Sequence, residues 1–294
     1  MVNFSNTNKE QDLKEYINLL FPYAYNILGS TDDAKDAVQD VMSNYVASSR
    51  KHEIQNLGGY LVKGVINQSI NIKNKKNKTD SDRISLPEPV ATERADTDVH
   101  LRDIASYALL ILLEQLSVKE RAVFILKEAF SYSHQEIADV LSSTVENSRK
   151  LLSRAKEKLH KSKQALYPSK GKKAFQQMEN FVDAIRNGDT KNLEHLLSND
   201  IMVVADGGTK VQVVRDITTG KKASINLLLY VFDKFLKSQS VRYTEINHQP
   251  AILYYEGKTL ISCQVFSMNA EYKICKISAI VDPDKLRHIT QNTL

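Results

Sequence analysis

Apolar residues recur at three- and four-residue steps over most of the chain before residue 166, which is the period of one face of an α-helix. The segment 32–45 shows this pattern clearly. Its apolar positions are Ala34, Ala37, Val38, Val41 and Tyr45. The acidic and amide positions, mostly on the other side, are Asp33, Asp36, Gln39 and Asp40. The spacing predicts a helix whose acidic face is either simply solvated or a docking surface for a basic partner.

Three S-x-x-E sequences follow in close succession, at Ser117–Glu120, Ser133–Glu136 and Ser143–Glu146. In such a capping box the hydroxyl accepts from an amide of the first helical turn, and the carboxylate reaches back to the cap amide. The pattern therefore predicts three short helices, with a tight break at 141–144 before the last one.

The last of these helices has two different faces. Its inner positions are Val145, Ser148, Leu152, Ala155 and Leu159. Its outward positions are Glu146, Asn147, Arg149, Lys150, Ser153 and Arg154. A short helix, a tight turn and a helix with a basic, amide-rich outer face predict a helix-turn-helix. The alternative is a plain helical bundle with a solvated face.

After residue 171 the period changes. Helical stretches at 172–187 and 190–197 precede short apolar or alternating runs at 201–205 and 211–214. A helix at 221–236 then leads into runs at 241–246, 251–255, 259–266 and 272–281. The pairs Gly207-Gly208 and Glu256-Gly257 are turn signals. Helices followed by an antiparallel sheet describe an α+β domain.

Two changes of composition indicate linkers. The first lies at 74–98 and contains Pro87 and Pro89, which cannot both sit inside a helix or a paired strand. The second lies around 167–171. These boundaries predict an all-α domain at 1–78, a linker at 79–103, a second all-α domain at 104–166 and an α+β domain at 172–290.

The formal charge of +5 is a weak pointer to nucleic acid, but its distribution is informative. Residues 63–78 contain five lysines and no acid, and residues 149–163 contain seven cations against Glu157 alone. The lysine run is either a disordered, solvated tail or a binding surface. The spacing of Cys263 and Cys275 indicates a reducing compartment, with no metal and no cofactor. The polar start and the lack of a long apolar run predict a cytoplasmic protein with no membrane contact.

The stretch Asp33-Ala34-Lys35-Asp36-Ala37-Val38-Gln39-Asp40-Val41 resembles region 2 of the extracytoplasmic-function (ECF) sigma factors, of the sigma-70 family. This resemblance implies that Asp33, Asp36, Gln39 and Asp40 contact core RNA polymerase. The helix from Tyr60 to Lys75 is similar to the family's minus-ten helix, although Tyr60 and Asn71 stand where the family often has Trp and Asp. The implied DNA contacts are Lys63, Lys73, Lys75 and Lys76 to phosphates and Asn67 and Asn71 to base edges.

Residues 116–124, 132–138 and 147–155 are similar to region 4, which binds the minus-35 element in that family. Ser142 replaces the usual turn glycine, so Ser143 and Thr144 both remain candidate caps for the recognition helix. Thr144 also belongs to the predicted DNA surface. The implied base readers are Glu146, Asn147 and Lys150, and the implied backbone contacts are Arg149, Ser153 and Arg154.

Three further motifs resemble a subgroup with a fused C-terminal SnoaL-like domain. They are Leu86-Pro87-Glu88-Pro89, Asp206-Gly207-Gly208 and Asp282-Pro283-Asp284-Lys285. Ser85 and Asp282 stand where the subgroup has Trp and Asn. The resemblance implies a cone-shaped barrel that tunes sigma activity through contacts made by these three motifs.

SnoaL-like folds enclose an apolar pocket, and its candidate polar residues here are Asp206, His248, Tyr254 and Cys263. Each of them is more often structural, so the hypothesis is a sigma factor and not an enzyme. The predicted partners are core polymerase, promoter DNA and a small ligand in the C-terminal domain, with the free chain a monomer. Two alternatives stay open: a helix-turn-helix regulator with a ligand-binding domain, and an isomerase or hydrolase that uses the pocket.

Overall fold

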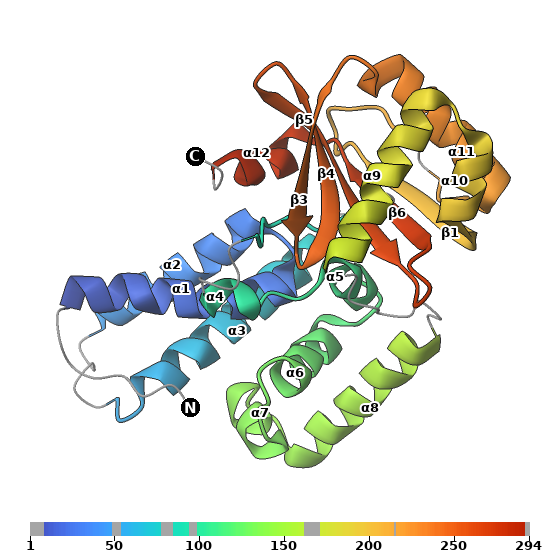
Figure 1. Cartoon of the computed structure of the whole chain (residues 1–294). Helices are drawn as coiled ribbons and strands as arrows, with labels where there is room; N and C mark the ends of the chain where they lie inside the picture. Colours follow the sequence, from blue (N-terminus) through green and yellow to red (C-terminus); the bar gives the residue numbers. More distant parts are fainter. Residues whose placement is uncertain are drawn as a thin grey trace. The chain divides into compact units, whose positions relative to one another are not determined.

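The computed structural model describes residues 9–48, 54–77, 85–93, 99–161, 171–214 and 216–291. The chain forms two compact units (Figure 1). The helical unit comprises Met1–Ser81, Ala95–Ala105 and Leu110–Lys163, and the sheet unit comprises Asp82–Arg94, Ser106–Leu109 and Gln164–Leu294. The second predicted linker falls largely outside the described residues.

Three long helices open the helical unit: α1 (Lys9–Leu28), α2 (Thr31–Ala47) and α3 (Leu57–Lys76). Side-chain caps start two of them, because Ser30 accepts from the amide of Asp33 and Asn56 from that of Gly59. All three helices pack on one another. Their buried residues include Ala24, Tyr25, Ala37, Val38, Leu61, Val65 and Ile66. The apolar stripe predicted for 32–45 is thus the inner face of α2.

Five shorter helices follow: α4 (Val99–Arg102), α5 (Tyr107–Leu113), α6 (Val118–Glu128), α7 (His134–Val140) and α8 (Val145–Lys161). The capping boxes Ser117–Glu120 and Ser133–Glu136 are both confirmed. The third predicted box is wrong, because Thr144 and not Ser143 caps α8, through its hydroxyl and the amide of Asn147 at 3.1 Å. Glu146 is therefore one residue too early to complete a box.

In the sheet unit, α9 (Lys172–Asn187), α10 (Thr190–Leu196) and α11 (Lys221–Val231), extended by η2 (Phe232–Leu236), accompany six strands. The strands are β1 (Leu197–Asp206), β2 (Thr218–Thr219), β3 (Ser240–Ile246), β4 (Gln249–Glu256), β5 (Thr259–Met268) and β6 (Ile274–Ile280). They form one sheet in the order β2-β1-β6-β5-β4-β3. The α+β class is confirmed.

Two details of the predicted sheet are wrong. Strands β1 and β6 pair in parallel, so the sheet is mixed and not purely antiparallel. Within the described residues the sheet is also open, with β2 and β3 at its two edges, and does not close into a barrel. The edge of β3 is engaged near its end by the first linker, where Ala91 bridges to Ile246.

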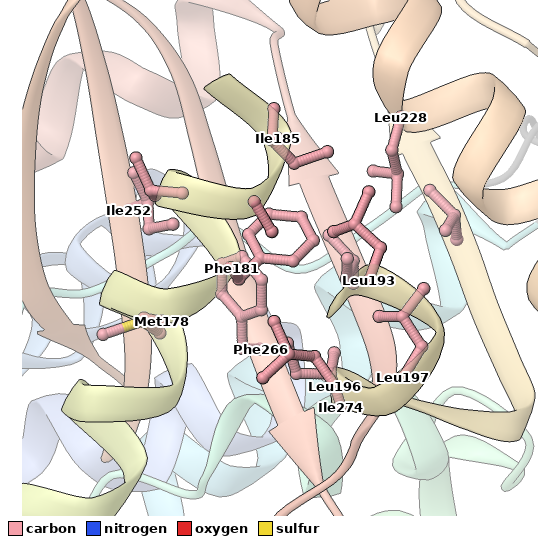
Figure 2. Close-up of a cluster of buried hydrophobic side chains, with 14 of the residues drawn as sticks. Met178, Phe181, Ile185, Leu193, Leu196, Leu197, Leu228, Ile252, Phe266 and Ile274 are labelled. Carbon is pink, nitrogen blue, oxygen red and sulfur yellow. The ribbon is translucent and has the colours of Figure 1, made fainter. Parts of the chain in front are cut away.

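A hydrophobic core lies between the helices and one face of the sheet (Figure 2). Met178, Phe181 and Ile185 of α9 point toward Ile252 and Phe266 on the strands, while α10 and α11 contribute further leucines. Phe181 and Phe266 meet edge to face with ring centroids 5.2 Å apart. An aromatic pair in this geometry adds about 1 kcal/mol beyond the area that it buries.

The turns of the sheet unit agree only in part with those predicted from the sequence. The Glu256-Gly257 hairpin is confirmed, with Gly257 at φ 59°. The turn between β3 and β4 is Asn247-His248, and both residues have positive φ, 47° and 60°. The run at 211–214 forms no strand, and the helix α12 (Pro283–Gln291) was not predicted.

Candidate nucleic-acid interface

The outer face of α8 is exposed throughout. Ser148, Leu152 and Ala155 are buried, as predicted for the inner face. The exposed residues are Glu146, Asn147, Arg149, Lys150, Ser153 and Arg154, together with the cap Thr144. The structure therefore places the predicted minus-35 residues on one open surface at the start of a long helix.

The turn before α8 sets the backbone conformation at the start of this exposed face. Ser142 adopts φ 47°, the left-handed conformation that favours glycine, which explains why a glycine is usual at this point. Asn147 donates from its side chain to the hydroxyl of Ser143 at 2.8 Å. Glu146 and Lys150 form an ion pair at 2.7 Å on the exposed surface. Contacts to base edges by these residues would replace these local bonds.

Some cations on α8 are neutralised by ion pairs and others are not. Lys156 pairs with Glu128 and Lys158 with Glu120, both at 2.7 Å. Arg149 and Arg154 form no ion pair with another described residue. Partial burial, together with nearby cations such as Lys127 and Arg149, lowers the pKa of His134. Among the described residues, these two arginines are thus cations of α8 that no carboxylate neutralises.

The lysine run of α3 is helical up to Lys76, so its reading as a disordered tail is wrong for the described residues. Asn71 and Lys75 are exposed. Lys76 pairs with Asp33 at 2.6 Å. Lys63 and Asn67 donate to carbonyls at the end of α7, and Lys73 pairs with Glu114.

Lys73 belongs to a charge cluster with Glu114 and Arg121. Its ammonium donates to Glu114 at 2.9 Å, and the guanidinium of Arg121, only 1% exposed, pairs with the same carboxylate. Burial alone raises the pKa of Glu114, but Arg121 and Lys73 outweigh it and hold that pKa below its usual range. Burial and Arg121 lower the pKa of Lys73, against the effect of Glu114. The carboxylate is therefore the member of the cluster that its surroundings keep charged.

The acidic face of α2 is partly free. Asp36 and Gln39 are exposed, whereas Asp40 accepts from Gln68 at 2.9 Å and Asp33 accepts from Lys76. The two acids in the first turn, Asp32 and Asp33, also favour the helix N-terminus electrostatically.

In the sheet unit, residues 85–93 of the first linker form a strap. Its first anchor is Asp206, 3% exposed, whose carboxylate accepts from the amide of Leu86 at 2.7 Å and from Lys285 at 2.7 Å. Lys285 also donates to the carbonyl of Leu86 at 2.5 Å and to the hydroxyl of Ser85 at 3.0 Å. Leu86, Pro87 and Pro89 are buried and Glu88 is half-buried.

The second anchor is the β3–β4 turn. The side chain of Asn247 accepts from the amide of Val90 at 2.9 Å, and its own amide donates to the Val90 carbonyl at 2.9 Å. The amide of Thr92 donates to Glu245 at 2.9 Å, and Glu93 pairs with Arg242 at 3.1 Å. The strap thus pairs with the end of β3 through the β-bridge between Ala91 and Ile246.

The three motifs of the sheet unit therefore meet around Asp206. Gly208, at φ +58°, donates to Asp206 at 2.9 Å. A Cβ on Gly208 would lie 2.2 Å from a carboxylate oxygen of Asp282, so a side chain here would displace Asp282 and would also be strained by the positive φ. Lys285 comes from α12, and the exposed Asp284 pairs with Lys210 at 2.7 Å on the surface. Pro283 is the first residue of α12, and Gly207 directly follows β1.

Sequence reasoning missed three residues that hold the strap region. Asn247 is one of them. Tyr107 donates from its hydroxyl to the carbonyl of Pro87 at 2.7 Å, and Gln249 accepts from the amide of Ala108 at 2.6 Å. Residues 106–109 belong to the sheet unit although they were predicted within 104–166. No sequence pattern marks such bonds, because each joins residues far apart in the chain.

The four predicted pocket residues do not converge. Tyr254 belongs to the hydrophobic core between sheet and helices. Cys263 pairs across the sheet with Leu253 and Ile280, and Ile280 in turn pairs with Asp206, so Cys263 and Asp206 face away from that core. His248 lies in a hairpin turn. Burial raises the pKa of the Cys263 thiol well above its usual value, so this thiol is a poor nucleophile.

Among the described residues, no group of three or more His, Cys, Asp or Glu side chains could hold a metal ion. None of the helices in the described ranges is long and apolar enough to cross a membrane.

Comparison with known proteins agrees with this arrangement. A family model described as "Sigma-70, region 4" matches residues 107–159. The probable ECF RNA polymerase sigma factor SigI of Mycobacterium tuberculosis is 27% identical over 281 residues, which cover 91% of each chain. The ECF RNA polymerase sigma factor SigJ of the same organism is 22% identical over 222 residues, 74% of this chain and 70% of SigJ.

The crystal structure of SigJ shares the fold. It covers 96% of this chain and 99% of its own, with a TM-score of 0.75 at 20% identity. The match therefore includes the sheet unit as well as the helices. These findings make the chain similar to sigma factors of the sigma-70 class. Along almost its whole length the chain is similar to ECF RNA polymerase sigma factors, and its C-terminal part is an α+β domain. The relatives SigI and SigJ are named as sigma factors and not as enzymes, in line with the prediction for this chain.

Proposed function

We propose that this chain directs core RNA polymerase to specific promoters and that its strap, held by the sheet unit, regulates this activity. The observation that carries the proposal is the exposed cationic face of α8 in a helix-turn-helix, within a chain similar to SigI along almost its whole length. The proposal places the protein in the cytoplasm, together with polymerase and promoter DNA.

At the minus-35 side, Arg149, Ser153 and Arg154 contact phosphates while Glu146, Asn147 and Lys150 read base edges, with Thr144 at the entry of the helix. Phosphate contacts release counterions, so binding weakens as salt rises. Region 2, which consists of α1, α2 and α3, supplies the minus-ten contacts from α3. The exposed Asp36 and Gln39, with Asp33 and Asp40 beside them, offer an acidic face to polymerase.

The strap is the regulatory element of the proposal, because it lies in the linker between the two DNA-binding regions. While residues 85–93 are bonded to Asp206, Asn247 and β3, they are held by the sheet unit. They then cannot add to the length of the flexible linker between the two DNA-binding regions. Release of the strap lengthens the tether between the two regions. A small ligand that binds the sheet unit only when the strap is released would shift this equilibrium by mass action.

Reconstituted transcription tests the proposal. Purified chain is added to core polymerase and a library of double-stranded templates, and the 5′ ends of transcripts are mapped. We expect initiation at a defined subset of sequences that core polymerase alone does not use. Unchanged start sites would contradict the sigma activity. A helix-turn-helix regulator without polymerase would instead bind its DNA tightly by itself and as a dimer.

The regulatory part is tested with the Asp206→Asn variant at the same templates. Asp206 touches the strap and lies outside the residues assigned to DNA or polymerase. We expect the same start sites with a changed transcript yield. Equal yield from the wild-type and variant chains, with the strap shown to be released, would contradict regulation by the strap.

A further inference from the structure

Three lysines from two distant parts of the sequence form one cationic surface on the sheet unit. Lys172 and Lys173 begin α9, and Lys273 directly precedes β6 in the turn that follows β5. The ammonium of Lys173 lies 4.3 Å from the centre of the Tyr272 ring. This cation–π contact brings the start of the helix next to the turn. We call the three lysines the basic end.

The backbone of the turn is fixed by hydrogen bonds of its own. The side chain of Asn269 accepts from the amides of Glu271 and Lys273, at 3.0 and 2.9 Å. The backbone amide of Asn269 donates to the carbonyl of Lys273 at 2.9 Å. Tyr272 adopts φ 62° within this turn. The fold therefore sets the position of Lys273 and of the ring that holds Lys173.

The charges of the basic end are not neutralised by the sheet unit. Lys172 and Lys173 are exposed, and Lys273 is half-exposed. Among the residues that the structure describes, none of the three forms an ion pair with a carboxylate. The turn contains one acid, Glu271, so the surface as a whole stays cationic. Such a surface fits a polyanion.

The length of the chain brings one polyanion within reach. In the proposed minus-35 complex, Arg154 of α8 holds a phosphate. From Arg154 the helix continues to Lys161, which adds about 10 Å at 1.5 Å per residue. The chain from Lys161 to Lys172 spans at most about 40 Å when fully extended. Lys172 therefore lies within about 50 Å of that phosphate, which corresponds to about 15 base pairs of duplex.

A weak surface is sufficient at this distance. Two sites joined by a short chain meet at an effective concentration of about 1 mM. Non-specific binding of a cationic surface to DNA has a Kd of about 0.1 mM at its weak limit in physiological salt. The ratio of the two values predicts about a tenfold gain in affinity for a promoter that has duplex beside the minus-35 element.

We infer that the basic end binds the phosphate backbone of the duplex upstream of the minus-35 element, as a second and sequence-independent DNA contact. This inference rests on the proposed function, because region 4 holds the duplex to which the sheet unit is tethered. The downstream duplex is the segment that polymerase and region 2 take up, which leaves the upstream side accessible. Phosphate contacts of this kind add affinity and position the protein without reading sequence.

Promoter templates of two lengths test the inference. The full chain with core polymerase is bound to a selected promoter that extends upstream of the minus-35 element by about 20 or by about 3 base pairs, beyond and well inside the calculated reach. The test variant combines Lys172→Gln, Lys173→Gln and Lys273→Gln. On the long template it should bind about tenfold more weakly than the wild-type chain. Its salt slope should be smaller by about 2 to 3, because each phosphate contact contributes about 0.9. On the short template the two chains should bind equally.

The matched control replaces three exposed lysines on other elements of the sheet unit: Lys222→Gln, Lys234→Gln and Lys258→Gln. It makes the same change of charge and should keep the wild-type affinity and salt slope. A variant with Lys→Arg substitutions at the basic end keeps the charge and should also behave as the wild type. Equal affinity of the wild type and the test variant on the long template overturns the inference, as does an equal loss in the control.

A loss that is the same on both templates also overturns the inference, because it assigns the lysines to polymerase and not to the duplex. Circular dichroism checks folding. If the test variant loses helical signal, the double variant Lys172→Gln and Lys273→Gln, which keeps the contact between Lys173 and Tyr272, takes its place. Initiation by the wild-type chain is measured in a separate reaction. Absence of initiation contradicts the proposed function, whereas initiation with equal affinities contradicts the upstream contact alone.

Discussion

The Asp206→Asn substitution perturbs the strap at its most connected point. The carboxylate accepts from Leu86 and Lys285, each at 2.7 Å, and from Gly208 at 2.9 Å. Asparagine has the same size, but it carries no charge and its amide nitrogen cannot accept a hydrogen bond. One of the three bonds must therefore be lost, and the remaining ones lose their charge assistance.

The free-energy cost of the substitution depends on the acceptors that Lys285 retains. Removing one partner of a buried ion pair costs about 3–5 kcal/mol when the remaining charge is left uncompensated. Lys285 is 15% exposed and retains the Leu86 carbonyl and the Ser85 hydroxyl as acceptors. The expected loss is therefore smaller, about 2–3 kcal/mol, which is roughly a 30- to 150-fold shift toward the released strap.

Amide hydrogen exchange measures this shift directly. The amides of Leu86, Val90 and Thr92 donate to Asp206, Asn247 and Glu245, so each reports one anchor of the strap. If the strap is released as a unit, all three exchange faster by the same factor in Asp206→Asn. The matched control is Asp284→Asn, which breaks only the surface pair with Lys210 and should leave exchange unchanged. Unchanged exchange in Asp206→Asn, or equal acceleration in the control, would refute the reasoning.

Three further outcomes are expected. Ser142→Gly should raise the free energy of unfolding by about 0.5–1 kcal/mol in a thermal melt, because φ 47° strains serine; a lower melting temperature would contradict this. The folded-state pKa of Glu114 is depressed, so its stabilising effect is present above the unfolded pKa of about 4.3 and is lost as pH falls through the lower folded value. The urea midpoint of unfolding should therefore drop in that pH range. Glu114→Gln should make this drop smaller. Arg154→Ala should lower the salt slope of promoter binding by about 1, and an unchanged slope, or an equal change in Arg186→Ala on α9, would count against a phosphate contact.

Local patterns predicted local structure well. The period of apolar residues gave the inner faces of α2 and α8, and the hydroxyl and carboxylate of Ser117–Glu120 and Ser133–Glu136 form the expected caps. Capping depends on residues three apart, so the sequence contains everything that the bond needs. The third box failed because Thr144 competed with its neighbour Ser143 for the same helix start.

Contacts between distant residues were not predictable in the same way. The parallel pairing of β1 with β6 joins strands separated by most of the domain. The Asn247-His248 turn lacks the glycine that usually marks two residues of positive φ. For the strap, resemblance indicated that Leu86, Asp206 and Lys285 act together, but the bonds that Asn247, Gln249 and Tyr107 contribute depend on the folded sheet. The boundaries 1–78 and 104–166 within the helical unit remain predictions, as do the roles of the individual DNA-contacting residues.

The central claim is that one chain brings two helical surfaces to separate elements of one promoter while polymerase is bound. Footprinting of the complex of chain, core polymerase and a selected promoter tests this most directly. We expect two separate protected segments, with the upstream one weakened by Arg154→Ala and the downstream one retained. A single protected segment, or a footprint identical to that of core polymerase alone, would contradict the account.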